Sequence, residues 1–244
     1  MTVQELFSEG KLTEAIQSLG NEVRDHPTDV RRRTFLFELL CFAGDFSRAE
    51  KHLNLLSDAS PEAEIGALLC RSALSAERKR QAFFEGKQYL AAAAQANEPR
   101  PGTLNGEPFQ TIEDVDPRIG PRLEVFLAGE YVWLPFAHIG SLDMQPPRHL
   151  RDLLWSPAAI SAGPSLKGQD FGEVLLPVLY PYSGQHARDT VRLGRETEWL
   201  PGSEETGDIP FGQKILVLDG EREISFLEIR SLQFHDAAAA ATPA

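Results

Sequence analysis

The chain has 244 residues, of which 42% are hydrophobic and 25% charged, with a formal net charge of −12. These values are ordinary for a soluble globular protein, while the negative charge argues against non-specific binding to nucleic acid or to an anionic membrane. No apolar run approaches the roughly 20 residues that span a bilayer, and the amphipathic N-terminus lacks the layout of a signal peptide. We therefore expect a cytoplasmic protein without membrane insertion.

The first part of the chain carries an internal repeat. Residues of similar type recur 34 positions apart in two segments, a spacing that is the period of the tetratricopeptide helix–turn–helix unit. The matched pairs are Gly10 and Gly44, Leu12 and Phe46, Ala15 and Ala49, Leu19 and Leu53, and Pro27 and Pro61. In such a unit the glycine lets the backbone turn at the end of one helix, and the proline stops the next helix.

The repeat predicts helices at about 29–43 and 46–56, preceded by a partial unit whose first helix is clipped to Val3–Ser8. A third helix follows Pro61 and passes, through a break, into another that carries Phe83 and Phe84. Two prolines and a glycine between 97 and 102 then end the helices. We therefore predict a tetratricopeptide-like helical region over residues 1–98.

The rest of the chain predicts a compact α+β domain over residues 103–236, followed by a disordered alanine-rich tail at 237–244. One helix is expected within 111–128, starting at Pro117 or Pro121. Beyond it lie short apolar runs bounded by proline and glycine, which indicate a mostly antiparallel sheet. The pair Asp219–Gly220 between two such runs predicts a hairpin.

The sequence carries no motif that predicts a catalytic, cofactor or metal site. It lacks a phosphate-binding glycine loop, a nucleophile elbow and the paired cysteines or histidines of a zinc site. His186 and Asp189 share one polar segment, and a solvated loop explains them better than an acid–base pair does. The acidic residues around Asp219 are explained by the turn, because a calcium loop needs a denser array of oxygens.

The exposed side of the helix at 29–43 is the predicted protein-binding surface. This helix is the leading one of the complete repeat, and such helices line the concave face of repeat stacks. Charged and apolar side chains together suit an amphipathic helix or an extended peptide. The residues expected there are Arg31, Thr34, Glu38, Cys41 and Phe42. The edge of the C-terminal sheet is the second choice.

Five segments of the second half, in this order, resemble the ImpE family, also called TagJ or SciE-type virulence proteins. They are LRDLLWSPA (150–158), LPVLYPYSG (176–184), VRLGRETEWL (191–200), FGQKILVLDGE (211–221) and LEIRSLQF (227–234). The resemblance extends over nearly the whole chain except the tail. It implies a cytosolic accessory protein of a bacterial type VI secretion system, with no catalytic activity and no cofactor.

The resemblance also implies partners. They are the small subunit of the contractile sheath, bound through its N-terminal helix, and the AAA+ unfoldase that recycles the sheath. Two other functions stay open on the sequence. One is an enzyme, a hydrolase or transferase with a helical recruitment module, and the other is a structural protein that assembles with itself, for example as a homodimer.

Overall fold

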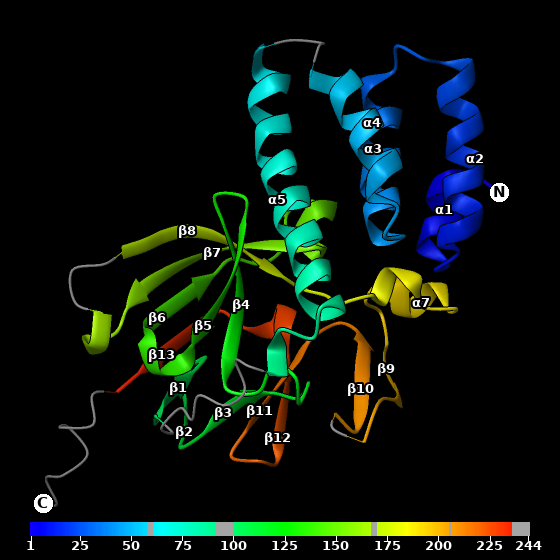
Figure 1. Cartoon of the computed structure of the whole chain (residues 1–244). Coiled ribbons are helices and arrows are strands. Elements are labelled where there is room, and N and C mark those ends of the chain that lie inside the picture. Colours follow the sequence, from blue (N-terminus) through cyan, green and yellow to red (C-terminus); the bar gives the residue numbers. More distant parts are fainter. Residues whose placement is uncertain (58–60, 91–99, 167–169, 205, 236–244) are drawn as a thin grey trace, which may run out of the picture.

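The computed structural model describes residues 1–57, 61–90, 100–166, 170–204 and 206–235. Helices make up the part before residue 91, and the first strand begins at Gly102 (Figure 1). The predicted tail and most of the predicted boundary between 97 and 102 lie outside the described residues. Among the residues that are described, no helix combines the length and the apolar character that a membrane crossing needs.

The helical part consists of antiparallel helices in the order that the repeat predicts (Figure 1). They are α1 (Val3–Ser8), α2 (Leu12–Asp25), α3 (Val30–Phe42), α4 (Phe46–Ser57) and α5 (Pro61–Glu85). Gly10 and Gly44 adopt the left-handed conformation, with φ of 80° and 68°, at the ends of α1 and α3. This is the role expected of a glycine that follows a helix, so the tetratricopeptide-like arrangement is confirmed.

Helix α5 runs through the position at which a break was expected. It is continuous over 25 residues, and the turn comes only at residues 86–88, where Lys87 has a φ of 50°. The buried residues Ala67, Ala73 and Leu74 keep one face of the helix against the core along its length. Because this face is unbroken, nothing in the packing ends the helix earlier.

The β part is built from antiparallel pairs throughout the described strands. Its largest sheet has eight strands in the order β2-β1-β13-β6-β7-β8-β4-β5. These strands are β1 (Gly102–Leu104), β2 (Glu107–Phe109), β4 (Arg122–Leu127), β5 (Glu130–Pro135), β6 (Ile139–Met144), β7 (Trp155–Ala162), β8 (Asp170–Pro177) and β13 (Ser231–Phe234). The smaller sheets hold β3 (Ile112–Asp114), β11 (Ile215–Leu218) and β12 (Arg222–Ser225), and β9 (Thr197–Pro201) with β10 (Asp208–Gly212). The predicted α+β fold is confirmed.

Short helices connect the strands. They are the 3-10 turns η1 (Phe136–His138), η2 (Leu150–Leu153), η3 (Pro164–Leu166), η4 (Ser183–Gln185) and η5 (Phe226–Glu228), and helix α7 (Asp189–Arg192). The hairpin predicted at Asp219–Gly220 joins β11 to β12, and both turn residues have positive φ, as a two-residue turn of this kind requires.

The helix predicted within 111–128 is wrong, because this segment forms β3 and β4. Strand β4 contains Arg122 and Glu124, and both side chains are buried. The partners of Glu124 are far away in the sequence, since it binds Arg80 and Lys214. Pairings over such separations leave no local pattern from which the strand could be predicted.

One hydrophobic core runs through the helices and the β part. A buried ionic cluster lies where α5, β4 and the segment before β11 meet. The Lys214 ammonium is 2.7 Å from both Asp114 and Glu124, and Arg80 binds Glu124 from the helix side. A second contact is made by α7, whose Asp189 accepts hydrogen bonds from the backbone and hydroxyl of Thr13 on α2. Polar contacts at both of these places therefore dock the helices on the β part.

Candidate protein-binding groove

The surface predicted on α3 is only partly exposed. Arg31 at the start of the helix is exposed, and its side chain has no ion pair among the described residues. Thr34 is half-buried and donates its hydroxyl proton to the Val30 carbonyl at 2.9 Å. These two residues lie where an outside partner can reach them, and their role in binding stays a prediction.

The expected exposure of Cys41 and Phe42 is wrong. Their exposed fractions are 3% and 1%, and both belong to the core. The β part covers this end of α3: a small cavity of about 30 Å³ is lined both by these two side chains and by Leu179 and Tyr182. The concave face that a repeat stack offers to a partner is here filled by the chain itself, and burial raises the pKa of the Cys41 thiol well above its usual value.

Glu38 lies between these two groups of residues. It is half-buried and lies close to Arg151 and Asp152 of η2. Burial raises the pKa of Glu38 to about 7, although the charge of Arg151 acts in the opposite direction. The structure thus brings Glu38 to the β part and not to an open groove.

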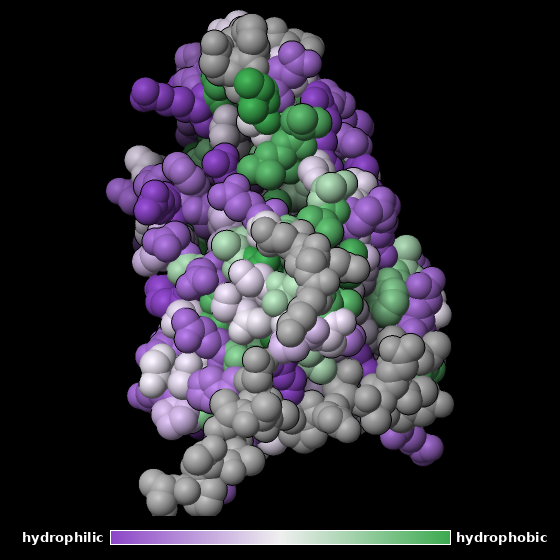
Figure 2. Space-filling view, turned by 90° about the vertical axis from the view of Figure 1, so that its left-hand side faces the viewer, coloured by the Kyte–Doolittle hydropathy of each residue, from purple (hydrophilic) through white to green (hydrophobic). Residues whose placement is uncertain are grey.

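A more exposed apolar surface lies on α5. Ile65, Leu68 and Leu69 have exposed fractions of 73%, 65% and 46%, and their spacing places them on one side of the helix. Figure 2 faces this side of the molecule and shows hydrophobic side chains gathered on the helical part and continuing downward over the β part. Exposed leucine and isoleucine side by side are uncommon on a protein that has no partner there.

Below these residues α5 and the large sheet form two adjoining cavities of about 230 and 530 Å³. The residues that line both of them are Leu69, Gln145, Pro157 and Leu175. We call this surface, together with Ile65 and Leu68, the α5 groove. Pro157 and Leu175 are directly paired on β7 and β8, so they form one row of its floor.

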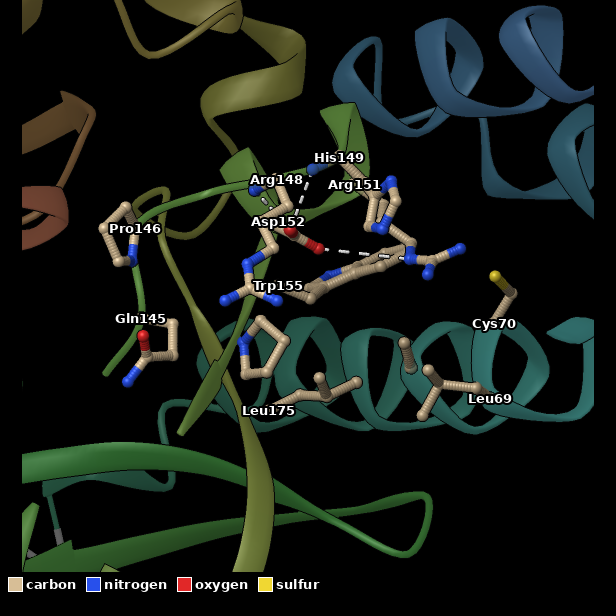
Figure 3. A pocket seen from close by; sticks show the side chains of 12 residues that line it. Leu69, Cys70, Gln145, Pro146, Arg148, His149, Arg151, Asp152, Trp155 and Leu175 are labelled. Atoms are coloured by element: carbon tan, nitrogen blue, oxygen red, sulfur yellow. Dashed lines mark hydrogen bonds and ion pairs between the residues drawn. The ribbon is translucent and has the colours of Figure 1, made fainter. Parts of the chain in front are cut away.

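Trp155 lines the first of these cavities (Figure 3). The side chain is 4% exposed and belongs to the hydrophobic core, so its ring separates this cavity from the core. In Figure 3, Arg148 and Arg151 come from the segment above this ring, and Leu69 and Cys70 lie on α5 below. The cavity wall is therefore apolar with a basic rim.

The rim is held in place by Asp152. This carboxylate accepts hydrogen bonds from the backbone N–H groups of Arg148 and His149 at 2.8 and 2.9 Å, and its other oxygen is 3.9 Å from the Arg151 guanidinium. The arrangement is a helix cap that orders η2. The Asp152 carboxylate is engaged by these two backbone groups and by Arg151. The guanidinium of Arg148 forms no hydrogen bond or ion pair within the described part of the chain.

Sequence reasoning missed this groove, although α5 contains a signal for it. The apolar residues of 65–74 are more numerous than one buried stripe needs. Ala67, Cys70, Ala73 and Leu74 form the stripe that faces the core. Ile65, Leu68 and Leu69 form a second stripe beside the first, and a second stripe on a helix indicates a second packing partner.

The alternative site at His186 and Asp189 is not one constellation. The His186 ring is 3.5 Å from Glu198 and accepts a hydrogen bond from the backbone N–H of Arg188, whereas Asp189 binds Thr13 and Arg192. Each side chain thus has a separate structural partner. Within the described ranges, no group of three or more histidines, cysteines and carboxylates is arranged to hold a metal ion.

Fold and groove together define a class: a short tetratricopeptide-like helical stack docked on an antiparallel β part, with an apolar groove between them. The sequence model of the ImpE protein family matches residues 106–233, and that of the tetratricopeptide repeat matches residues 6–71. The chain belongs to the ImpE family.

Two relatives extend the comparison over nearly the full length. A Pseudomonas aeruginosa protein described as type VI secretion system accessory component TagJ is 31% identical over 96% of this chain and 91% of its own length. The crystal structure of a Vibrio parahaemolyticus protein superimposes with a TM-score of 0.83 at 24% identity, and covers 98% of this chain and 99% of that one. The second comparison shows that the whole fold is shared.

Proposed function

We propose that the chain is a non-catalytic accessory component of a bacterial type VI secretion system and acts by binding a sheath component. The Pseudomonas aeruginosa relative, with a third of its residues identical over nearly all of this chain, supports the assignment to this system. The fold supports a binding role, since tetratricopeptide-like stacks commonly act as protein-binding scaffolds.

The observation that carries the proposal is the α5 groove. The exposed side chains of Ile65, Leu68 and Leu69 stand beside cavities floored by Pro157 and Leu175. An amphipathic helix laid along this surface would remove them from water, which is the usual helix-in-groove mode. The groove is already formed in the free chain, so little ordering opposes binding.

The partner that we propose is the N-terminal helix of the small sheath subunit, bound in the cytoplasm. A segment held in the groove is withheld from other contacts. Binding would therefore modulate sheath assembly, or sheath recycling by the AAA+ unfoldase, which is the second partner that we propose.

The test is the affinity of this chain for a fluorescent peptide with the sequence of that N-terminal helix, measured by anisotropy. Leu69→Asp should weaken binding at least about tenfold, because Leu69 lines both cavities. The matched control is Leu55→Asp on α4, since Leu55 is equally apolar and 58% exposed but does not line the α5 groove. The control should bind within about twofold of wild type.

Failure would take one of two forms. If the wild-type chain does not bind the peptide, the proposed partner is wrong. If it binds and only Arg31→Glu on α3 weakens it, the contact lies on the surface predicted from the sequence and not in the α5 groove. Thermal unfolding of each variant confirms that the substituted chain is folded.

A further inference from the structure

The α5 groove has opposite charges at its two ends, and its apolar part lies between them. The cavity lined by Trp155 is bordered by Arg148 and Arg151, and the adjoining cavity is bordered by Asp143 and Glu173. Among the described residues that line the two cavities, the one further carboxylate is Asp152, which is occupied by the η2 cap. Each end of the groove therefore has a charge that is available to a partner.

The register of the sheet fixes the acidic end. Asp143 on β6 pairs with Ala159 on β7, and Ala159 pairs with Glu173 on β8. The three residues form one row across three strands and all are exposed. Neither carboxylate forms an ion pair within the described part of the chain. Two neighbouring strands are about 4.8 Å apart, so the two carboxylates stand about 10 Å from each other on the same face.

The same register gives the distance between the two ends. Along β7 the row of Ala159 is followed by Pro157 and then by Trp155, and all three residues line the cavities. Four residues of a strand span about 13 Å. An α-helix covers this distance in about nine residues, or about two and a half turns.

We propose that the α5 groove selects an amphipathic helix with an acidic side chain that pairs with Arg148 and Arg151 and, about nine residues along, a basic side chain that pairs with Asp143 and Glu173. This inference rests on the proposed function and adds the orientation of the bound helix. A helix lying in the reverse direction would place like charges together at both ends, which disfavours it.

The basic end stands out because the chain as a whole is acidic, with a net charge of −12. Acidic partners are repelled by most of such a surface, and an arginine pair gives them one place to bind. Arginine also pairs with carboxylates through two parallel hydrogen bonds, which fixes position as well as affinity. The apolar floor supplies contact area, and the two charged ends supply direction.

The experiment uses the sheath-helix peptide and two groove variants of the full chain, Arg148→Glu and the double substitution Asp143→Lys with Glu173→Lys. The matched controls are Arg24→Glu and Glu221→Lys, because both residues are exposed and line neither cavity of the groove. Each groove variant should bind at least about tenfold more weakly, and the controls should bind within about twofold of wild type. Raising the salt concentration should weaken wild-type binding more than binding by either groove variant.

A rescue makes the result specific. A second peptide with every acidic residue changed to Lys and every basic residue changed to Glu should bind weakly to wild type. It should bind more tightly to the triple variant that combines Arg148→Glu, Asp143→Lys and Glu173→Lys. Equal binding of both peptides to wild type and to this variant would overturn the inference while leaving the proposed function intact. Absence of any binding by wild type would overturn both.

Discussion

The Arg80 guanidinium on α5 binds both carboxylate oxygens of Glu124 on β4, at 2.7 and 2.8 Å. Both side chains are buried, and Arg80 also donates to the Leu179 carbonyl at 2.8 Å. The pair joins the helices to the sheet at the point where α5 passes over β4 and β5 (Figure 1).

Replacing Arg80 by Leu should lower the free energy of unfolding by about 3–5 kcal/mol, because Glu124 would keep a buried charge with one partner fewer. The same change at Arg78 is the matched control. Arg78 lies on the same helix and pairs with Glu50 at 2.8 Å, but both of these side chains are largely exposed. That pair should contribute less than about 1 kcal/mol. Urea denaturation measures both, and equal losses would contradict a structural role for the buried pair.

The helical part was predictable because its signals are local. A glycine that ends a helix and a small residue at a helix crossing recur with the repeat, and each acts within its own turn. The turn at Asp219 is local in the same way. In contrast, Glu124 is buried because of Arg80 and Lys214, which lie 44 residues before it and 90 after it. A strand whose position depends on such distant partners cannot be recognised from the residues next to it in the sequence.

The binding surface was misplaced for a related reason. The face of α3 that a repeat stack leaves open is covered here by η4 and the segment around Leu179, which come late in the chain. This packing buries Cys41 and Phe42 and leaves the second stripe of α5 as the exposed one. The repeat pattern describes how helices pack on each other, and it contains no information about where a following β part will dock.

Glu38 predicts a pH dependence of stability. Its pKa is raised from 4.5 to about 7 in the folded chain, so the folded state binds more protons than the unfolded state between these values. The free energy of unfolding should therefore fall as the pH rises from about 4.5 to about 7. Glu38→Gln removes the titratable group while keeping the size and shape of the side chain. Near pH 8 it should stabilise the chain by up to about 3 kcal/mol.

The control for this effect is Glu14→Gln on α2, whose side chain is exposed. Unfolding by urea at several pH values compares the three proteins. Wild type and Glu14→Gln should show the same decline with pH, and Glu38→Gln a flatter one. A decline of equal slope in all three would mean that other groups cause it.

The backbone at Gly184 packs closely against the turn between α3 and α4, so a larger residue at this position should destabilise the fold. A Cβ atom at this position would lie 2.6 Å from the backbone nitrogen of Gly44 and 2.9 Å from the backbone of Ala43. Backbone atoms cannot swing aside, so Gly184→Ala should push η4 away from the α3–α4 turn and cost about 1–3 kcal/mol. Gly20→Ala on α2 is the matched control, since nothing lies within 4 Å of its Cβ. It should stabilise the helix by about 0.5–1 kcal/mol. Thermal unfolding shows whether each substitution lowers or raises the stability of the chain.

The two cysteines give a chemical test of where a partner binds. Both are buried, and burial raises the pKa of each thiol, but only Cys70 lines the cavity at the basic end of the α5 groove. Iodoacetamide should therefore modify Cys70 slowly and Cys41 more slowly still, because the thiolate is the reactive form and Cys41 is reached only when the core opens.

With saturating sheath-helix peptide, the modification of Cys70 should slow by at least about fivefold, whereas a peptide bound on α3 near Arg31 would leave the entrance to this cavity open. Mass spectrometry of the digested chain follows each cysteine separately, so Cys41 reports any general stabilisation in the same sample. Equal slowing of both thiols would mean that the peptide stabilises the fold without covering the groove. An unchanged rate at Cys70 with bound peptide would move the contact to another surface.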